Sequence, residues 1–367
     1  MLVHLTRVQR IVLATAIVLS GIAGVAQATG TSEVLRFVLS GLALGALAAL
    51  VGAAIEQVGE RLGPGATGLL QSGLGNLPEL FVGIFALRKG LTGVVQAALV
   101  GSVLSNTLLV LGLAFLAGGL RHGAQRFPPE APRMIATLLI LAVGALLIPT
   151  LAVRLRTPAS SHANALSNVC AIVLLAVYVA SVPFWLRGGP QAPVVTEAAT
   201  RPPKPPEERT DGPEPWPLKL AISLLAVGSL LSALVSDWFV AALEPATKSL
   251  GISQTFTGLV IVAIASNAVE NAVGIRFALK ARPDYAISAI LNSPLQIALL
   301  LTPVLILLSR VVGPQQLTLV FPPLLVAALA VAAILVVVVI YDGEYTWLEG
   351  VALIAVYGII ATAFWWG

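Results

Sequence analysis

The chain has 367 residues, of which 57% are hydrophobic and only 10% are charged, and its mean hydropathy is +0.95. This balance is far from that of soluble domains and predicts an integral membrane protein in contact with the lipid bilayer. The net charge is +4, but no cluster of basic and aromatic residues indicates a nucleic-acid partner. A single cysteine, Cys170, excludes a disulfide within the chain.

Apolar segments of roughly 20 residues, the length that spans a bilayer, occur along most of the chain. The first, from about Val8 to Gln27, has two arginines at its start, Arg7 and Arg10, and ends in small residues, which fits both a membrane helix and a secretory signal peptide. The others lie at about 34–56, 65–87, 91–118, 133–152, 164–186, 218–240, 252–279, 285–309, 318–341 and 346–366. The pattern predicts an all-α membrane protein of about eleven transmembrane helices.

One stretch interrupts this pattern. Residues 187–217 are rich in proline and in charges of both signs, so they cannot bury enough apolar surface to fold by themselves. Their acidic residues lack the spacing of an EF-hand, which favours a solvated linker over a regulatory calcium site. We therefore expect a Pro-rich cytoplasmic linker.

The sequences on the two sides of the linker are related. Glu79 and Glu270 are 191 positions apart (270 − 79 = 191), and four further pairs of identical residues share this offset: Asn76 with Asn267, Gly83 with Gly274, Lys89 with Lys280, and Ser102 with Ser293. Five identities at one offset indicate a tandem duplication. The predicted organisation is an N-terminal helix (1–33), a first five-helix repeat (34–186), the linker (187–217) and a second five-helix repeat (218–367).

An odd number of spans per repeat has a topological consequence. The second repeat must enter the membrane from the side opposite the first, as in the inverted repeats of many secondary transporters. With the N-terminus in the cytoplasm, 14 of the 21 Lys and Arg residues fall on the cytoplasmic side. The positive-inside rule favours this orientation, with the C-terminus outside. We expect a bacterial inner (cell) membrane as the location.

The two carboxylates call for a functional explanation. A charged side chain at membrane depth costs about 2.5–3.5 kcal/mol on insertion scales. The nearest basic residues in sequence lie toward the helix ends, where they can reach water: Arg88, Lys89, Arg276 and Lys280. Pro78 precedes Glu79, and we expect it to remove a helical hydrogen bond and to bend the chain there. Val269 takes its place in the second repeat, so a break near Glu270 needs another cause.

The polar residues around these carboxylates supply oxygen ligands only. Amides, hydroxyls and backbone carbonyls together with two carboxylates suit a hard cation such as Ca2+, which takes 6 to 8 oxygens. No His or Cys accompanies them, which argues against zinc or copper. Glu79 and Glu270 are the predicted metal ligands, and no resident cofactor is expected.

The motifs around these residues resemble the calcium/proton exchangers of the cation/Ca2+ exchanger superfamily. The resemblance is carried by GNLPELFVGIFALRKG (Gly75–Gly90), by GSVLSNTLLVLG (Gly101–Gly112), and less closely by SNAVEN and SPLQIALLLTP. It implies an extra first helix followed by two inverted five-helix repeats. It also implies that Glu79 and Glu270 carry the transported cation and protons, while further side chains line the site: Asn76, Ser102, Asn267, Ser293 and Gln296.

Several positions differ from the family's usual residues. Ser266 and Asn292 stand where Gly is usual, and Asn271 stands where calcium/proton exchangers usually have His. Pro78 before Glu79 is closer to the sodium/calcium exchangers. The resemblance to the superfamily holds despite these differences. The identities of the transported ion and of the counter-ion stay open.

The resulting hypothesis is a secondary transporter, not an enzyme, that exchanges Ca2+ or a similar divalent cation such as Mn2+ for H+. Exchange driven by Na+ or K+ on the same scaffold is the alternative, and assembly into homo-oligomers stays open. A membrane-embedded hydrolase with Glu79 and Glu270 as general acid and base is less favoured, because the chain's three histidines, His4, His122 and His162, lie in predicted loops or ends.

Overall fold

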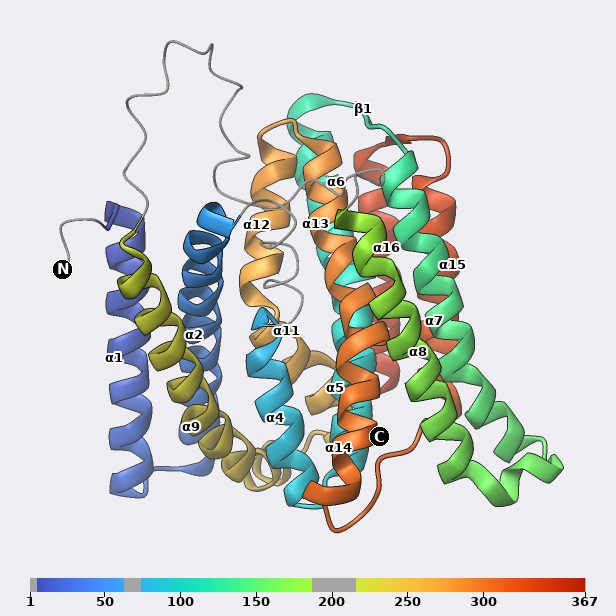
Figure 1. The fold of residues 1–367 in the computed structure, drawn as a ribbon, viewed down its shortest axis with the longest axis horizontal. Coiled ribbons are helices and arrows are strands. Elements are labelled where there is room, and N and C mark those ends of the chain that lie inside the picture. The colour runs from blue at the N-terminus through green and yellow to red at the C-terminus, as the bar shows by residue number, and fades with distance from the viewer. Residues whose placement is uncertain (1–4, 63–73, 187–215, 367) are drawn as a thin grey trace. The chain divides into compact units, whose positions relative to one another are not determined.

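The computed structural model describes residues 5–62, 74–186 and 216–366, and nearly all of them are helical (Figure 1). Eight helices within these ranges are long and apolar enough to cross a membrane. The predicted all-α membrane fold is therefore confirmed, whereas the total of about eleven spans stays a prediction. Residues 187–215 of the predicted linker lie outside the described residues.

The helices form two compact units, and neither unit coincides with a predicted repeat. Unit 1 comprises Met1–Val82 with Pro193–Ser249, and unit 2 comprises Gly83–Ala192 with Leu250–Gly367. Each unit therefore takes helices from both halves of the chain. The division into repeats at 34–186 and 218–367 remains a prediction from the sequence.

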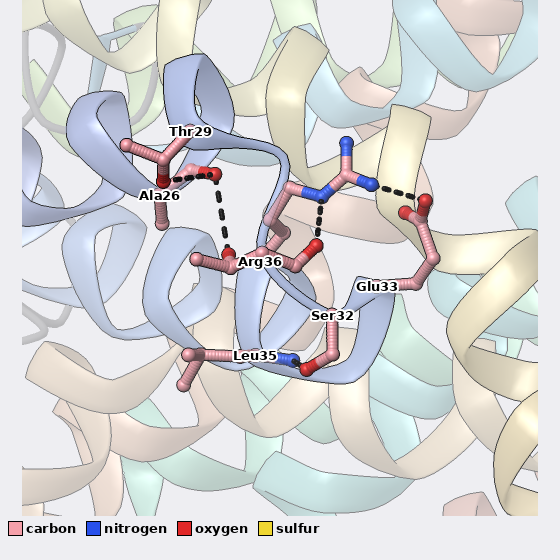
Figure 2. A network of polar contacts seen from close by, with 7 residues as sticks. Ala26, Thr29, Ser32, Glu33, Leu35 and Arg36 are labelled. Atoms are coloured by element: carbon pink, nitrogen blue, oxygen red, sulfur yellow. Dashed lines mark hydrogen bonds and ion pairs between the residues drawn. The ribbon is translucent and has the colours of Figure 1, made fainter.

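Unit 1 contains the helices α1 (Arg7–Thr29), α2 (Glu33–Leu62) and α9 (Leu218–Leu250). A polar network shapes the turn between α1 and α2 (Figure 2). The Ser32 hydroxyl accepts a hydrogen bond from the Leu35 N–H at 3.4 Å, as expected of a residue that caps a helix N-terminus. Arg36 donates from Nε to the Thr31 carbonyl at 3.0 Å and forms an ion pair with Glu33.

Helix α9 packs on both α1 and α2 through aromatic side chains. The ring of Phe239 stacks on Phe37 of α2 with ring centroids 4.6 Å apart. The neighbouring Trp238 lies against Gly24 of α1, where an added Cβ would approach its ring to 3.2 Å. The face of α9 that carries these two aromatic residues is thus directed toward α1 and α2.

A buried tryptophan joins the three helices of unit 1 near the start of α9. Trp216 is only 2% exposed and packs among Leu5, Ala54 and Leu220. Its backbone N–H donates to Gln57 Oε1 at 2.8 Å, and its indole N–H donates to Gln9 Oε1 at 3.0 Å. Because both polar groups of this residue are satisfied, the tryptophan can be buried without leaving an unpaired donor.

Unit 2 contains the remaining long helices and the second part of α4 (Leu77–Arg88). The complete helices are α5 (Thr92–Leu104), α6 (Leu111–His122), α7 (Glu130–Arg154), α8 (Ala163–Leu186), α12 (Ala268–Leu279), α13 (Pro283–Gln296), α14 (Thr302–Val312), α15 (Pro323–Ile340) and α16 (Trp347–Ala363). Shorter elements are α10 (Gln254–Phe256), α11 (Ala263–Ser266), a 3-10 turn (Pro158–His162) and three π-helical segments, Ser105–Val110, Thr257–Val262 and Ile297–Leu301.

Helix boundaries recur at the offset found in the sequence. Helices α4 and α12 begin and end 191 residues apart, and so do the starts of α5 and α13 and the starts of α6 and α14. The π-helical segments Ser105–Val110 and Ile297–Leu301 also end 191 residues apart. Since π-helical turns are rare and are frequently found at functional sites, this repetition directs attention to the residues beside them.

Two short strands depart from the all-helical expectation. β1 (Gln125–Arg126) pairs antiparallel with β2 (Glu344–Tyr345), and Arg126 Nε donates to Glu344 Oε2 at 2.8 Å. Tyr345 is 1% exposed and stacks on Phe115 at 4.0 Å between ring centroids. Burial raises the pKa of the Tyr345 hydroxyl to about 12. The ribbon thereby ties the connection α6–α7 to the connection α15–α16.

The connection between α14 and α15 also differs from the sequence expectation, which placed an apolar span from about 318. Helix α15 begins only at Pro323. The preceding residues 316–322 form neither helix nor strand, and side chains satisfy several of their backbone groups. Gln96 donates to the carbonyls of Thr318 and Val320. The N–H donors and their hydroxyl acceptors are Leu317 with Ser309, Leu319 with Ser167, and Phe321 with Thr150.

Glycines bring α5 into direct backbone contact with the segment Thr257–Val262. A Cβ at Gly101 would lie 2.2 Å from the Leu259 carbonyl oxygen, and a Cβ at Gly258 would lie 2.8 Å from the Val94 carbonyl oxygen. Neither space admits a methyl group, so these two residues set the distance between the two elements. Gly83 and Gly274 are likewise close-packed, against Leu305 and Ile290.

We predict that Gly101→Ala lowers stability by more than the usual 1–3 kcal/mol of an overpacked site, because the new methyl group meets backbone instead of a movable side chain. Gly93→Ala is the matched control in the same helix, since nothing lies within 4 Å of a Cβ there. Thermal unfolding of both purified variants in detergent tests this. Equal melting temperatures for the two variants would contradict the contact.

Candidate functional site

Buried polar side chains from three parts of unit 2 meet in one hydrogen-bonded network. Asn267, between α11 and α12, donates from Nδ2 to Ser102 Oγ of α5 at 3.0 Å. Its Oδ1 accepts from Ser293 Oγ of α13 at 3.2 Å. All three side chains are at most 5% exposed. Three predicted site residues that are far apart in the sequence are therefore brought together.

Asn106 is a fourth member of this network that the sequence reasoning did not select. Its Nδ2 lies 3.2 Å from Asn267 Oδ1 and 3.3 Å from Ser293 Oγ, and the residue is fully buried. Its Oδ1 accepts no hydrogen bond from any residue that the structure describes. The offset of 191 places Ile297 opposite Asn106, so the comparison of repeats gave no signal for it. Its place in the first turn of the π-helical segment Ser105–Val110 is the structural signal.

The chain breaks at Asn267, although no proline is present there. The helical stretch Gln254–Ser266 and the helix Asn271–Leu279 are inclined by 61° to one another. Asn267 itself has φ −96° and ψ 14°, outside the helical range, and its Nδ2 donates to the Ala263 carbonyl at 2.9 Å. The Asn267 amide therefore satisfies a carbonyl near the end of the first helical stretch and also donates to Ser102 of α5.

Glu270 is the third residue of α12, directly after this break. Its side chain lies outside what the structure describes. Glu79 holds the equivalent place as the third residue of α4, in the first turn. The N-terminal turn of a helix stabilises negative charge, because its free N–H groups and the helix dipole point there. Both predicted carboxylates thus stand where the backbone favours an anion.

The structure corrects the expected effect of Pro78. We expected this proline to remove a helical hydrogen bond and bend the chain, but it occupies the second position of α4. A first-turn N–H has no acceptor within its helix, so a proline at this position costs no hydrogen bond. Asn76 precedes the helix, is 7% exposed, and accepts a backbone hydrogen bond from Leu80 at 3.0 Å. Asn76 and Glu79 belong to unit 1.

Gln296 is the last residue of α13 and is 8% exposed. It stands immediately before the π-helical segment Ile297–Leu301, one turn from Ser293. Ser105, 191 positions earlier, begins the corresponding segment of the first half and is fully buried. A polar side chain thus stands at the same place in both halves, next to a local widening of the helix.

The network offers neutral oxygen atoms to a ligand. Hydroxyl and amide oxygens are ligands of hard cations, and they coordinate without adding charge. Among the residues described, no group of three or more His, Cys, Asp or Glu side chains is placed to hold a metal ion. The network of Ser102, Asn106, Asn267 and Ser293 itself contributes hydroxyl and amide groups and no carboxylate.

Comparison with known proteins identifies the family of this chain. The family described as Sodium/calcium exchanger protein matches residues 32–186 and 220–366. A protein of Synechocystis sp. named Ca(2+)/H(+) antiporter is 37% identical over 347 residues, which cover 91% of this chain and 92% of the relative.

Two solved structures share the fold. The structure of native YfkE aligns with a TM-score of 0.79 and 30% identity over 96% of this chain and 99% of YfkE. The H+/Ca2+ exchanger CAX aligns with a TM-score of 0.73 over 98% of this chain and 92% of CAX; at 15% identity this likeness concerns the fold alone. From the family match and the long alignment with the Synechocystis protein, this chain belongs to the sodium/calcium exchanger protein family.

Proposed function

We propose that this protein is a secondary active antiporter that exchanges Ca2+ for H+ across a membrane by alternating access. The observation that carries the proposal is the buried network of Ser102, Asn106, Asn267 and Ser293 beside the helix break that precedes Glu270. Relatives that align over most of the chain carry the name Ca(2+)/H(+) antiporter, which supports Ca2+ and H+ as the exchanged ions. Since the family and these relatives are ion exchangers, the activity is transport and not an enzymatic reaction.

Glu79 and Glu270 are the proposed shared cation and proton site. One divalent cation or two protons neutralise the same two carboxylates, so the ions exclude each other. A site with two bare negative charges is strongly disfavoured in a low-dielectric barrier, whereas a neutralised site is not. Exchange then occurs because the site crosses the membrane barrier either with one bound divalent cation or with two bound protons. No covalent step is needed.

The neutral residues have a different proposed role. Asn76, Ser102, Asn267, Ser293 and Gln296 supply oxygens that complete the coordination of Ca2+, together with Asn106. In the described network Ser102, Asn267 and Ser293 hydrogen-bond one another when the cation is absent, whereas Asn106 Oδ1 accepts no hydrogen bond from any described residue. When a cation enters, coordination replaces these hydrogen bonds. When the site is empty, the hydrogen bonds lower the free-energy cost of burying its polar groups.

The proposed topology follows from the duplication. Two inverted five-helix repeats place equivalent loops on opposite sides of a bacterial inner membrane, with the N-terminus in the cytoplasm and the C-terminus outside. Mn2+ is a further candidate cargo, and Na+ or K+ is the alternative driving ion. Transport assays with each ion separate these choices. Inorganic cations and bilayer lipids are the expected partners.

Glu79→Gln and Glu270→Gln are each predicted to abolish pH-gradient-driven Ca2+ uptake into liposomes. Glutamine keeps the shape of the side chain and removes the charge that binds a cation or releases a proton. Folding should persist, because an intramembrane charge is lost and not gained, so the melting temperature in detergent should stay equal or rise. Near-normal proton-coupled uptake by either variant would refute the shared carboxylate site.

Ser102→Ala and Ser293→Ala are the controls for this pair. Each removes one neutral oxygen, so we expect the Ca2+ concentration for half-maximal uptake to rise while maximal uptake stays within a few-fold of wild type. A complete loss of uptake in a stable serine variant would assign these hydroxyls a larger role than ligation.

The inverted topology predicts opposite labelling of two equivalent residues. Ala124 and Gln315 are 191 positions apart, and both are exposed, in the connections α6–α7 and α14–α15. With Cys170 replaced, Gln315→Cys should react with an impermeant thiol reagent outside intact cells. Ala124→Cys should react only after the membrane is opened. Reaction of both from the same side would contradict inversion.

A further inference from the structure

Asp237 lies in the middle of α9, far from either end of that helix. Lys219 and Lys248 are near the two ends, and at 1.5 Å per residue they are about 44 Å apart, close to the full thickness of a bilayer with its headgroups. Asp237 is then about 5 Å from the midpoint between them, well within a hydrocarbon core of about 30 Å. This third carboxylate at membrane depth is not part of the network in unit 2.

The surroundings of Asp237 within unit 1 do not account for its charge. The side chain is exposed, and none of the described residues of unit 1 forms an ion pair with it. Its neighbours Trp238 and Phe239 point to α1 and α2, so Asp237 is directed away from the helices that α9 packs against. Ionisable residues at this depth face water-filled cavities or partners and mark ion pathways, because lipid cannot solvate them.

The face of α9 that carries Asp237 has different residues toward its two ends. Residues one and two turns further along that face are Ala241 and Glu244, and Glu244 forms an ion pair with Lys248 at 2.8 Å. In the other direction the nearest large side chains are Leu234 and Leu230, which are 46% and 73% exposed. Small and charged residues thus connect Asp237 with the Lys248 end of the helix, whereas leucines occupy the way to the Lys219 end.

The first half of the chain has no corresponding carboxylate. The starts of α2 and α9 are 185 residues apart and their ends 188, and at these offsets or at 191 the counterpart of Asp237 is Gly52, Ala49 or Ala46. A symmetric role in packing would suit either half equally. A charge found in one half alone is suited to a step that takes place on one side of the membrane.

We propose that Asp237 is a water-accessible carboxylate that attracts cations from the Lys248 side of the membrane. The inference rests on the proposed Ca2+/H+ exchange and adds a carboxylate that acts on the arriving cation. A fixed negative charge beside a low-dielectric medium raises the local concentration of cations and their rate of arrival. Under the proposed orientation, the Lys248 side is the outside.

The first test is sided transport in liposomes of known protein orientation. Asp237→Asn should raise the Ca2+ concentration for half-maximal exchange about tenfold when Ca2+ is added on the Lys248 side, and should leave the other side unchanged. Asp237→Glu, which keeps the charge, should stay within about twofold of wild type. Equal effects on both sides, or none, would overturn the inference.

The proposed exchange is checked in the same preparations. Wild-type protein without Ca2+/H+ exchange would refute the proposed function. Normal exchange by wild-type protein, loss in Glu79→Gln and an unchanged Asp237→Asn would refute only the role of Asp237.

A second test measures water access directly and does not depend on activity. With Cys170 replaced by serine, Asp237→Cys should react with a charged thiol reagent in the membrane. Leu234→Cys, one turn away at a similar depth, is the matched control and should not react. Failure of both to react would overturn the proposal, as would a disulfide between Asp237→Cys chains, which would place this face at an interface between copies.

Discussion

The backbone contact between Gly101 and Leu259 is the constraint on which the site depends. Because no side chain fits between them, α5 and the segment Thr257–Val262 lie as close as two helices can. At that distance a short serine hydroxyl on α5 reaches the Asn267 amide, with Nδ2 and Oγ 3.0 Å apart. A wider spacing would break this hydrogen bond between two buried polar groups, which is costly in a membrane protein.

Buried polar side chains elsewhere in unit 2 satisfy backbone instead of a ligand. Gln96, Thr150 and Ser167 bond the extended residues that precede α15, so the chain can cross the helix ends without a paired strand. The ribbon β1–β2 likewise links the connection α6–α7 to the connection α15–α16. These hydrogen bonds hold the connections of unit 2 to its helices, between which the polar network lies.

The two halves of the chain share several helix boundaries but differ in their chemistry. Pro78 corresponds to Val269, in helices that begin and end at the same offset, and Asn106 corresponds to Ile297, between helices that begin at that offset. The position of Asp237 in the second half corresponds to glycine or alanine in the first. Equivalent backbones with different side chains allow a transporter to present different polar groups on its two sides while it keeps one mechanism of alternation.

The sequence by itself determined the membrane character, the duplication and the carboxylates, because hydropathy, charge and a fixed offset are properties of the chain alone. It also singled out Ser102, Asn267 and Ser293 as site residues. Only the tertiary structure decided that these three meet, that Asn106 joins them, and that Pro78 stands harmlessly in a first turn. The two compact units, which cross the repeats, were equally invisible in the sequence. The physical reason is that these features depend on distances between residues far apart in the chain, which close packing at glycines sets.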